Sequence, residues 1–265
     1  MRLVTAIFFF GIVFLDVCAQ GEIDDQEKIF YRNEQTYAIN LNTHGISGGF
    51  RYAKRIDAFK KTLYEAEFAQ IKDQEEIKIT FSSSQQIGGS FVYGKLNAFA
   101  TLRAGIGLQR ELFRKEDKGG ISIRYFYLFG PSLGFIKPVY YDIYTIETDP
   151  DGNQQEVTRR MKFEPHVLNN IERKAPFYVG FDELSVVPGI YGKFGFTFEF
   201  SKRDMAFTAL EAGVILDAFI KKIPIMANDN NTWFFPAFFV GYRFGKVIDS
   251  QFNTSLNRLD EALTD

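Results

Sequence analysis

The chain has 265 residues, a formal net charge of −2 and a single cysteine, and it is rich in aromatic residues, with 30 Phe and 13 Tyr. A charge so close to neutral gives no electrostatic reason to expect nucleic acid as a partner. One cysteine excludes a disulfide framework within the chain and a thiolate metal site.

The first residues predict a secretory signal peptide. A basic start at residues 1–2 precedes an uncharged apolar run at 3–15, and the small residues at 17–19 suit a signal peptidase. We therefore expect cleavage after Ala19, which gives a signal peptide at 1–19. A transmembrane helix needs about 20 apolar residues, more than this run offers. The other alternative, a lipoprotein anchored through Cys18, is disfavoured by the residues just before that cysteine.

Beyond a polar periplasmic segment at 20–34, apolar and polar residues alternate with the period of two that a half-buried β-strand shows. The predicted strands are separated by connections at 44–45, 56–59, 73–89, 113–119, 147–182, 201–204 and 221–231. The longest clean alternation runs from Ser90 to about Leu112. The chain therefore predicts eight strands, followed by a polar periplasmic tail at 247–265 whose leucines have helical spacing.

Two places leave the number of strands open. The apolar positions change parity across Thr43-His44-Gly45, which predicts a tight turn, with one long strand and a glycine bulge as the alternative. Gly130-Pro131 interrupts the alternation at 120–145, which is either one strand that outgrows the membrane or two elements bent at the proline. A hairpin at that point would give ten strands.

The stretch 191–200 indicates what the strands contact. Four phenylalanines occupy alternate positions and share one face, whereas the other face carries charge, glycine and threonine. A strand has this composition when its outer face meets lipid and its inner face meets a polar lumen. The expected lipid-facing residues are Phe194, Phe196, Phe198, Phe200, Leu210, Val214, Leu216, Phe238, Val240, Tyr242 and Phe244.

The lengths of the connections support a membrane barrel. Bacterial barrels have short periplasmic turns and longer extracellular loops. The second, fourth and sixth predicted connections are short, and three of the other four are long. We therefore predict an all-β fold in the cell outer membrane. It is a closed antiparallel up-and-down transmembrane β-barrel at 35–246, with a long extracellular loop at 147–182.

A soluble carrier barrel of the lipocalin kind is the strongest rival, because it shows the same alternation with its apolar residues inside. Heavy use of Phe, Tyr and Leu on the apolar faces favours the membrane barrel. The stretch 193–200 and the terminal Gly241-Tyr242-Arg243-Phe244 resemble the outer-membrane assembly signal, although the terminal strand departs from it in glycine spacing. The mature chain is similar to small, porin-like outer-membrane barrels of Bacteroidota-type bacteria, a resemblance that assigns no activity.

The polar faces predict a lumen lined by opposite charges. An eight-stranded barrel is just wide enough for side chains to fill it, so we expect ion pairs to plug the lumen. The expected lumen charges are Arg51, Arg55, Glu65, Glu67, Lys95, Arg103, Arg124, Lys193, Glu199, Glu211, Asp217 and Arg243.

These features predict a non-enzymatic role, as a structural, adhesive or accessory subunit surrounded by outer-membrane lipids. The loop at 147–182 is far longer than strand closure requires, so we expect it to contact a protein partner or a polysaccharide. A narrow pore for small solutes or ions is the first alternative. A lipid-modifying enzyme that uses His44 near Ser47 is the second. Oxygen-bearing residues at 147–153 lack the glycine and glutamate spacing of an EF-hand, so no metal or cofactor is expected.

Overall fold

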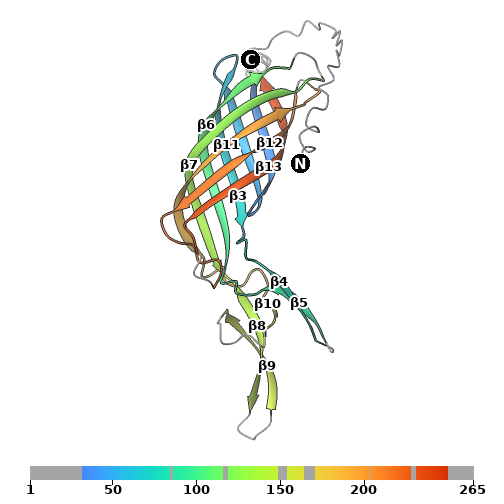
Figure 1. Ribbon diagram of the computed structural model, residues 1–265, viewed down its shortest axis with the longest axis vertical. Coiled ribbons are helices and arrows are strands. Elements are labelled where there is room, and N and C mark those ends of the chain that lie inside the picture. Colours follow the sequence, from blue (N-terminus) through green and yellow to red (C-terminus); the bar gives the residue numbers. More distant parts are fainter. Residues whose placement is uncertain are drawn as a thin grey trace, which may run out of the picture.

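The computed structural model describes residues 32–83, 86–115, 119–148, 154–163, 171–203, 205–227 and 231–249, and it confirms the closed antiparallel barrel. Figure 1 shows an elongated barrel with smaller β structures projecting from one end. The barrel strands are β1 (Arg32–Asn42), β2 (Gly45–Arg55), β3 (Lys60–Ile71), β6 (Asn97–Phe113), β7 (Ser122–Pro138), β11 (Ser185–Glu199), β12 (Ala206–Phe219) and β13 (Phe234–Asp249). The predicted signal peptide, most of the lead-in and nearly all of the tail lie outside the described residues.

The strands follow each other around the barrel in the order β1-β13-β12-β11-β7-β6-β3-β2, and β2 pairs with β1 to close it. The turns that follow β2, β6 and β11 are short and lie at the end where β1 begins and β13 ends. The connections after β3, β7 and β12 are longer and lie at the opposite end, which we call the outer end. This is the distribution that the connection lengths predict. No helix in the described part of the chain is long and apolar enough to cross a membrane.

Side chains alternate across the barrel wall. In β11, Phe194 and Phe196 are exposed on the outside, whereas Lys193 and Thr197 are buried inside. The same period of two runs through β3 and β6. The burial pattern therefore follows from the sequence alternation, because a strand sends successive side chains to opposite faces.

The barrel has eight strands, so the ten-strand alternative is wrong. β7 runs through Gly130 and Pro131 without turning, and it stays paired with β11 at both residues. Its pairing with β6 skips these two positions, since proline has no N–H to donate to a neighbouring strand. The single long strand at 36–55 is also wrong. The chain turns between Asn42 and Gly45. A Cβ atom on Gly45 would lie 2.2 Å from the carbonyl oxygen of Gln70, so this position requires glycine.

The outer connections contain strands where the sequence analysis predicts loops. The stretch predicted as a loop at 73–89 contributes to a hairpin of β4 (Lys78–Ser83) and β5 (Gln86–Val92). The alternation expected as one strand from Ser90 is broken at Gly94, which has a φ of 74°. The barrel strand β6 therefore begins only at Asn97. An apolar residue occupies an even-numbered position both just before and just after the turn at Gly94, so the sequence pattern alone does not reveal that two separate strands are present.

The predicted loop at 147–182 likewise carries part of a three-stranded sheet, in the order β10-β8-β9. Its strands are β8 (Tyr140–Thr148), β9 (Gln154–Lys162) and β10 (Ile171–Lys174). One face of this outer sheet packs in a cluster with Phe91, Val139 and Phe163. Polar, charged composition conceals such strands, because a sheet with one solvated face needs few apolar residues.

Candidate functional site

The barrel interior holds a network of buried ion pairs around Glu65. One carboxylate oxygen of Glu65, Oε2, lies 2.5 Å from Nε of Arg51 and 3.0 Å from Nη2 of Arg243. The other oxygen, Oε1, lies 2.8 Å from Nζ of Lys193. Glu211 lies 2.7 Å from Arg51 and 2.9 Å from Arg243. These five side chains are buried and come from five different strands, so they join distant parts of the wall.

A second group of pairs continues the network toward the outer end. Glu67 lies 2.5 Å from Nζ of Lys193 and 2.5 Å from Nη1 of Arg103. Arg103 also reaches Asp217, with Nη2 and Oδ2 2.6 Å apart. Lys193 thus links the two groups, since it contacts both Glu65 and Glu67.

The central network is electrically balanced. Its members are the cations Arg51, Arg103, Lys193 and Arg243 and the carboxylates Glu65, Glu67, Glu211 and Asp217. Buried charges are tolerated when they are paired and hydrogen-bonded. With four positive and four negative groups, the loss of one member leaves another group with uncompensated charge.

Neutral side chains occupy further hydrogen-bonding positions around these charges. The hydroxyl of Thr197 donates to Glu211 at 2.9 Å, and it accepts a hydrogen bond from the amide of Gln109 at 3.3 Å. The amide of Asn40 donates to Glu67 at 3.4 Å. The network is therefore hydrogen-bonded to side chains of β1, β6 and β11, on several sides of the barrel.

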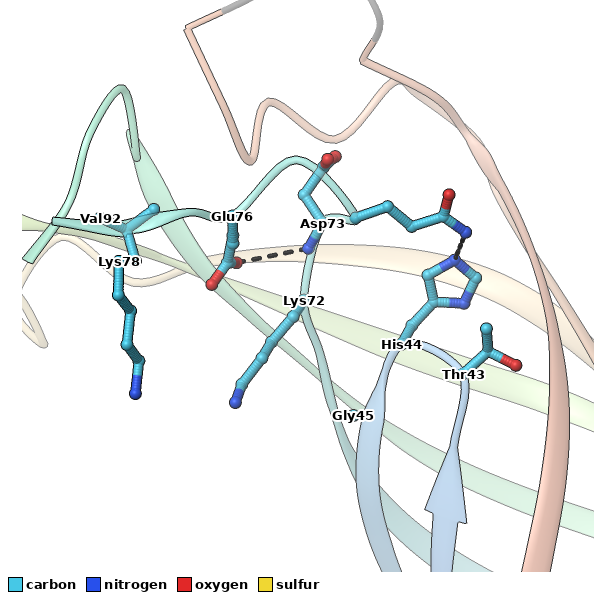
Figure 2. A pocket seen from close by; sticks show the side chains of 9 residues that line it. Thr43, His44, Gly45, Lys72, Asp73, Glu76, Lys78 and Val92 are labelled. Carbon is cyan, nitrogen blue, oxygen red and sulfur yellow. Dashed lines mark hydrogen bonds between the residues drawn. The ribbon is translucent and has the colours of Figure 1, made fainter.

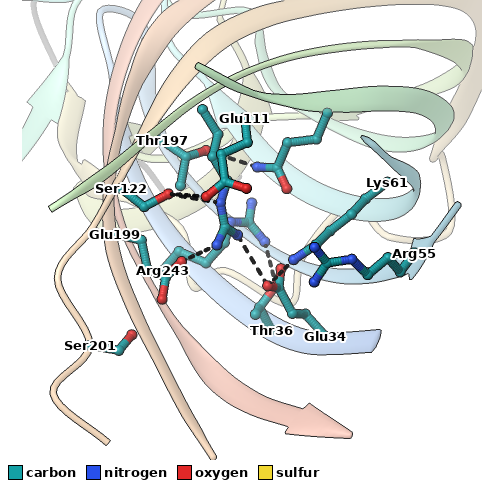
Figure 3. A network of polar contacts seen from close by, with 12 residues as sticks. Glu34, Thr36, Arg55, Lys61, Glu111, Ser122, Thr197, Glu199, Ser201 and Arg243 are labelled. Carbon is teal, nitrogen blue, oxygen red and sulfur yellow. Dashed lines mark hydrogen bonds and ion pairs between the residues drawn. The ribbon is translucent and has the colours of Figure 1, made fainter. Parts of the chain in front are cut away.

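A second polar cluster lies nearer the short turns, where Figure 3 shows Glu34, Lys61 and Glu199. Glu34 pairs with Lys61 and lies 3.1 Å from Nη1 of Arg124. Arg124 also pairs with Glu199, whose other oxygen lies 3.2 Å from Nζ of Lys115. This cluster fills the end of the barrel opposite the outer sheet.

Apolar side chains close the outer end. Ile223, Ile225 and Met226 belong to the connection between β12 and β13, and they are buried in a cluster with barrel residues that include Phe99 and Phe219. The interior thus holds a polar cluster near the short turns, the balanced ion network, and an apolar cluster at the outer end.

Ten of the predicted lumen charges form ion pairs within the two polar clusters, and two do not, although Arg55 lies beside Lys61 in the second cluster (Figure 3). Arg55 is the last residue of β2, and its guanidinium donates to the carbonyls of Asp57 and Ala58 in the following turn. Lys95 precedes β6 and pairs at 2.5 Å with Glu76 of the connection that follows β3. Both residues keep the inward parity but lie at or beyond the end of a strand, where parity no longer specifies direction.

Sequence reasoning missed Glu34 and Lys61. Glu34 falls in the predicted lead-in, but β1 begins at Arg32 and includes it. Lys61 has the same parity as Glu65 in β3, so the alternation was a sufficient signal for it.

The residues expected to face lipid lie on the outside of the barrel. Ten of them have exposed fractions between 38% and 73%, and Val214 is half-buried. A soluble carrier barrel has the reverse arrangement, with apolar residues inside and polar residues outside. The distribution of apolar and polar side chains is therefore opposite to that of the carrier alternative.

A cleft of about 450 Å³ lies at the outer end, and Figure 2 shows its lining. Nε2 of His44 lies 3.1 Å from the amide nitrogen of Gln74. Burial lowers the pKa of His44 below its usual value of 6.5, and the charge of Asp73 opposes this shift. The side chains of Lys72 and Lys78 point to the same side of the cleft.

The structure does not bring His44 and Ser47 together as a catalytic pair. Ser47 is buried inside the barrel, where its hydroxyl accepts a hydrogen bond from Asn40 at 3.2 Å. His44 lies in the turn and bonds to Gln74. In the described residues no group of three or more His, Cys, Asp or Glu is placed to hold a metal ion. Most of the stretch 147–153 lies outside that part of the chain.

Tyr141 attaches the outer sheet to the connection that leads from the β4–β5 hairpin to β6. Its hydroxyl lies 3.0 Å from the carbonyl oxygens of both Val92 and Lys95, to which it donates. On the other face of the sheet, Glu183 accepts hydrogen bonds from Tyr140 at 2.6 Å and from Lys162. The hydrogen bond from Lys162 and, to a smaller extent, that from Tyr140 lower the pKa of Glu183. The bond to Glu183 raises the pKa of Lys162.

No protein-family model and no curated protein sequence matches the chain. Among solved structures, it is similar to Ail, the attachment invasion locus protein of Yersinia pestis, in complex with the heparin analogue sucrose octasulfate, at 8% identity and a TM-score of 0.37, covering 83% of this chain and 99% of that one. Neisserial surface protein A gives 9% identity, a TM-score of 0.36 and coverage of 82% and 96%. The N-terminal β-barrel domain of Pseudomonas aeruginosa OprF is similar at 9% identity and a TM-score of 0.32, covering 80% of this chain and 98% of that one.

Proposed function

We propose that the protein is an integral outer-membrane β-barrel with a plugged lumen and a structural or adhesive role, in which the outer β structures contact a partner. The observation that carries this proposal is the inverted polarity of the barrel. Its interior holds a balanced set of buried charges, whereas large apolar side chains cover its outside. Such a surface is stable in lipid and would expose a large apolar area in water.

Strand length supports the membrane assignment. A tilted strand crosses the hydrocarbon layer with about 9–11 residues. The barrel strands have between 11 and 17 residues. The longest of them therefore extend beyond the membrane at the outer end, where they lead into the hairpin and the outer sheet (Figure 1).

The filled interior supports a plug over a pore. Ions would have to pass the network around Glu65 and then the apolar cluster that contains Ile225. The side chains of both obstacles come from several strands, so no single rotamer change removes them. This leaves the outer β structures, rather than the lumen, as the part available to a partner.

Membrane fractionation tests the location. The mature protein is expected in the outer-membrane fraction and to be released only by detergent. Recovery from the soluble periplasmic fraction without detergent would overturn the membrane assignment and would favour the carrier.

Planar-bilayer recordings test the plug. We expect no steady single-channel steps from the wild-type protein. A shift of gel mobility on heating, measured on the same preparation, shows that a folded barrel was present. Steady steps from that preparation would replace the plugged barrel with the narrow-pore alternative.

A further inference from the structure

The exposed face of the outer sheet carries two arginines that share one carboxylate. Asp142 of β8 is the register partner of Arg160 in β9 and of Arg173 in β10, so the three side chains lie in one row on the same face. Nε of Arg160 lies 2.9 Å from Oδ1 of Asp142, and Nε of Arg173 lies 3.2 Å from Oδ2. Each oxygen of the carboxylate thus holds one guanidinium.

The burial of the three side chains is unequal. The side chain of Asp142 is only 3% exposed, whereas those of Arg160 and Arg173 are 45% and 60% exposed. One negative charge lies beneath two positive charges, so the row presents a net positive charge to solvent. In the described part of the chain, neither guanidinium has a hydrogen-bond acceptor other than Asp142. The terminal N–H groups of both arginines are therefore available to a ligand.

The surroundings keep this face open. The opposite face packs through Tyr141 and Ile143 into an apolar cluster, so the sheet cannot turn its charged face inward. Asp142 restrains both arginines before a ligand arrives, which lowers the entropy lost when a guanidinium binds an anion. An isolated exposed ion pair contributes little to stability, and the second arginine on one carboxylate leaves a positive charge that Asp142 alone does not neutralise.

We propose that this face binds an anionic polysaccharide through Arg160 and Arg173, with sulfate or carboxylate groups as the recognised chemistry. The inference rests on the proposed function, because it requires the outer sheet to face the exterior of the cell. The arginines lie on the two strands that flank β8, which separates their backbones by about 10 Å. Their guanidinia lie closer together than the backbones do, because both Nε atoms bind the carboxylate of Asp142. Two adjacent cationic centres suit neighbouring charges along a polyanionic chain.

Features of the same face favour a polysaccharide over other anions. The sheet projects from the outer end of the barrel (Figure 1), beyond the barrel strands whose exposed apolar side chains would contact lipid. Tyr140, Lys162 and Glu183 extend the face with hydrogen-bonding groups.

The test uses the full-length mature protein in detergent and measures its binding to immobilised dextran sulfate, polygalacturonate and uncharged dextran at physiological ionic strength. We expect the wild type to bind at least one of the two polyanions and not uncharged dextran. Dextran sulfate and polygalacturonate distinguish sulfate from carboxylate recognition. The double variant Arg160→Gln/Arg173→Gln is expected to lose roughly tenfold or more in affinity, because charge-assisted hydrogen bonds of two guanidinia are removed.

The matched control is Arg114→Gln/Arg203→Gln, which makes the same change of net charge in the short turns at the opposite end. It should leave the affinity within about twofold, since charges beyond roughly 8 Å are screened at this ionic strength. An equal loss of affinity in both double variants would show that binding depends on net charge alone, and it would overturn the proposed site.

The variant Asp142→Asn distinguishes binding that depends on the orientation of the two arginines from binding that depends only on net positive charge. It makes the protein more positive, yet we expect weaker binding because the guanidinia lose the group that orients them. Tighter binding of the polyanions by Asp142→Asn would contradict the proposal that Asp142 orients Arg160 and Arg173 for binding. If the folded wild type stays in the outer-membrane fraction and binds neither polyanion, the inference fails while the proposed membrane barrel stands. Arginine-dependent binding to anionic lipid vesicles alone would also overturn it.

Discussion

Nη1 of Arg51 and Oε1 of Glu211 lie 2.7 Å apart inside the barrel, although 160 residues separate them in the chain. Their strands, β2 and β12, are not neighbours in the sheet. The pair therefore forms only when the sheet curves and closes through β1 and β13. The ion network depends on barrel closure in the same way, because its members come from strands on several sides of the wall.

Glu65→Gln is expected to lower the free energy of unfolding by about 3–5 kcal/mol, the range found when one partner of a buried ion pair is removed. The substitution keeps the side-chain volume but takes a negative charge away from Arg51, Lys193 and Arg243. Urea unfolding of the protein folded into lipid vesicles measures the loss.

Two controls accompany this experiment. Glu183→Gln changes an exposed carboxylate on the outer sheet and should stay within about 0.5 kcal/mol of the wild type. Adding Lys193→Met to Glu65→Gln removes the one excess positive charge, so the double variant should regain part of the lost stability. A double variant as unstable as the sum of its two single variants would contradict the charge-balance explanation.

Phe196→Arg is expected to prevent or slow assembly in the membrane. Phe196 lies on the exposed side of β11, and an arginine on the lipid face costs about 2–4 kcal/mol at the middle of the bilayer. The neighbouring change Thr197→Ser keeps the hydroxyl that donates to Glu211 and should assemble normally. The shift of gel mobility on heating reports assembly, and equal assembly of both variants would show that the two faces are wrongly assigned.

The alternation in the sequence predicts the faces of the barrel strands well because it depends only on the local period of two. Lys193 and Phe194 are assigned to opposite sides by this rule alone, and the structure places them there. The rule loses force where a strand ends. Arg55 and Lys95 have the inward parity, but their side chains bond to a turn and to Glu76.

The partners inside the lumen could not be predicted from the sequence. The contact between Arg103 and Asp217 depends on strand tilt and on the stagger that closes the barrel, and neither is encoded in local alternation. The row of Arg160, Asp142 and Arg173 was hidden for a related reason. Its strands are short and polar, and their register within a charged connection gives no periodic apolar signal.

The imidazole of His44 is expected to titrate below pH 6.5, because burial lowers its pKa. Asp73→Asn removes the charge that opposes this shift, so it should lower the pKa further. The sequence has two histidines, and a His166→Gln background leaves one imidazole signal for NMR titration. A lowered folded-state pKa means that the unfolded chain takes up the proton first, so this group favours the folded state less as the pH falls below 6.5. A midpoint that rises in Asp73→Asn would contradict the assignment.

Tyr141→Phe is expected to loosen the outer sheet without affecting the barrel. The phenol donates to the carbonyls of Val92 and Lys95, and its loss costs about 1–2 kcal/mol because these acceptors lie in a packed region. Burial raises the pKa of Tyr141 above its usual value of 10, so the donor persists in alkaline solution. Amide hydrogen exchange at 139–143 should accelerate by roughly 5- to 30-fold, while exchange in β12 stays unchanged. Tyr140→Phe is the matched control, since its phenol donates to the exposed Glu183. Equal acceleration in the two variants would show that Tyr141 does not anchor the sheet.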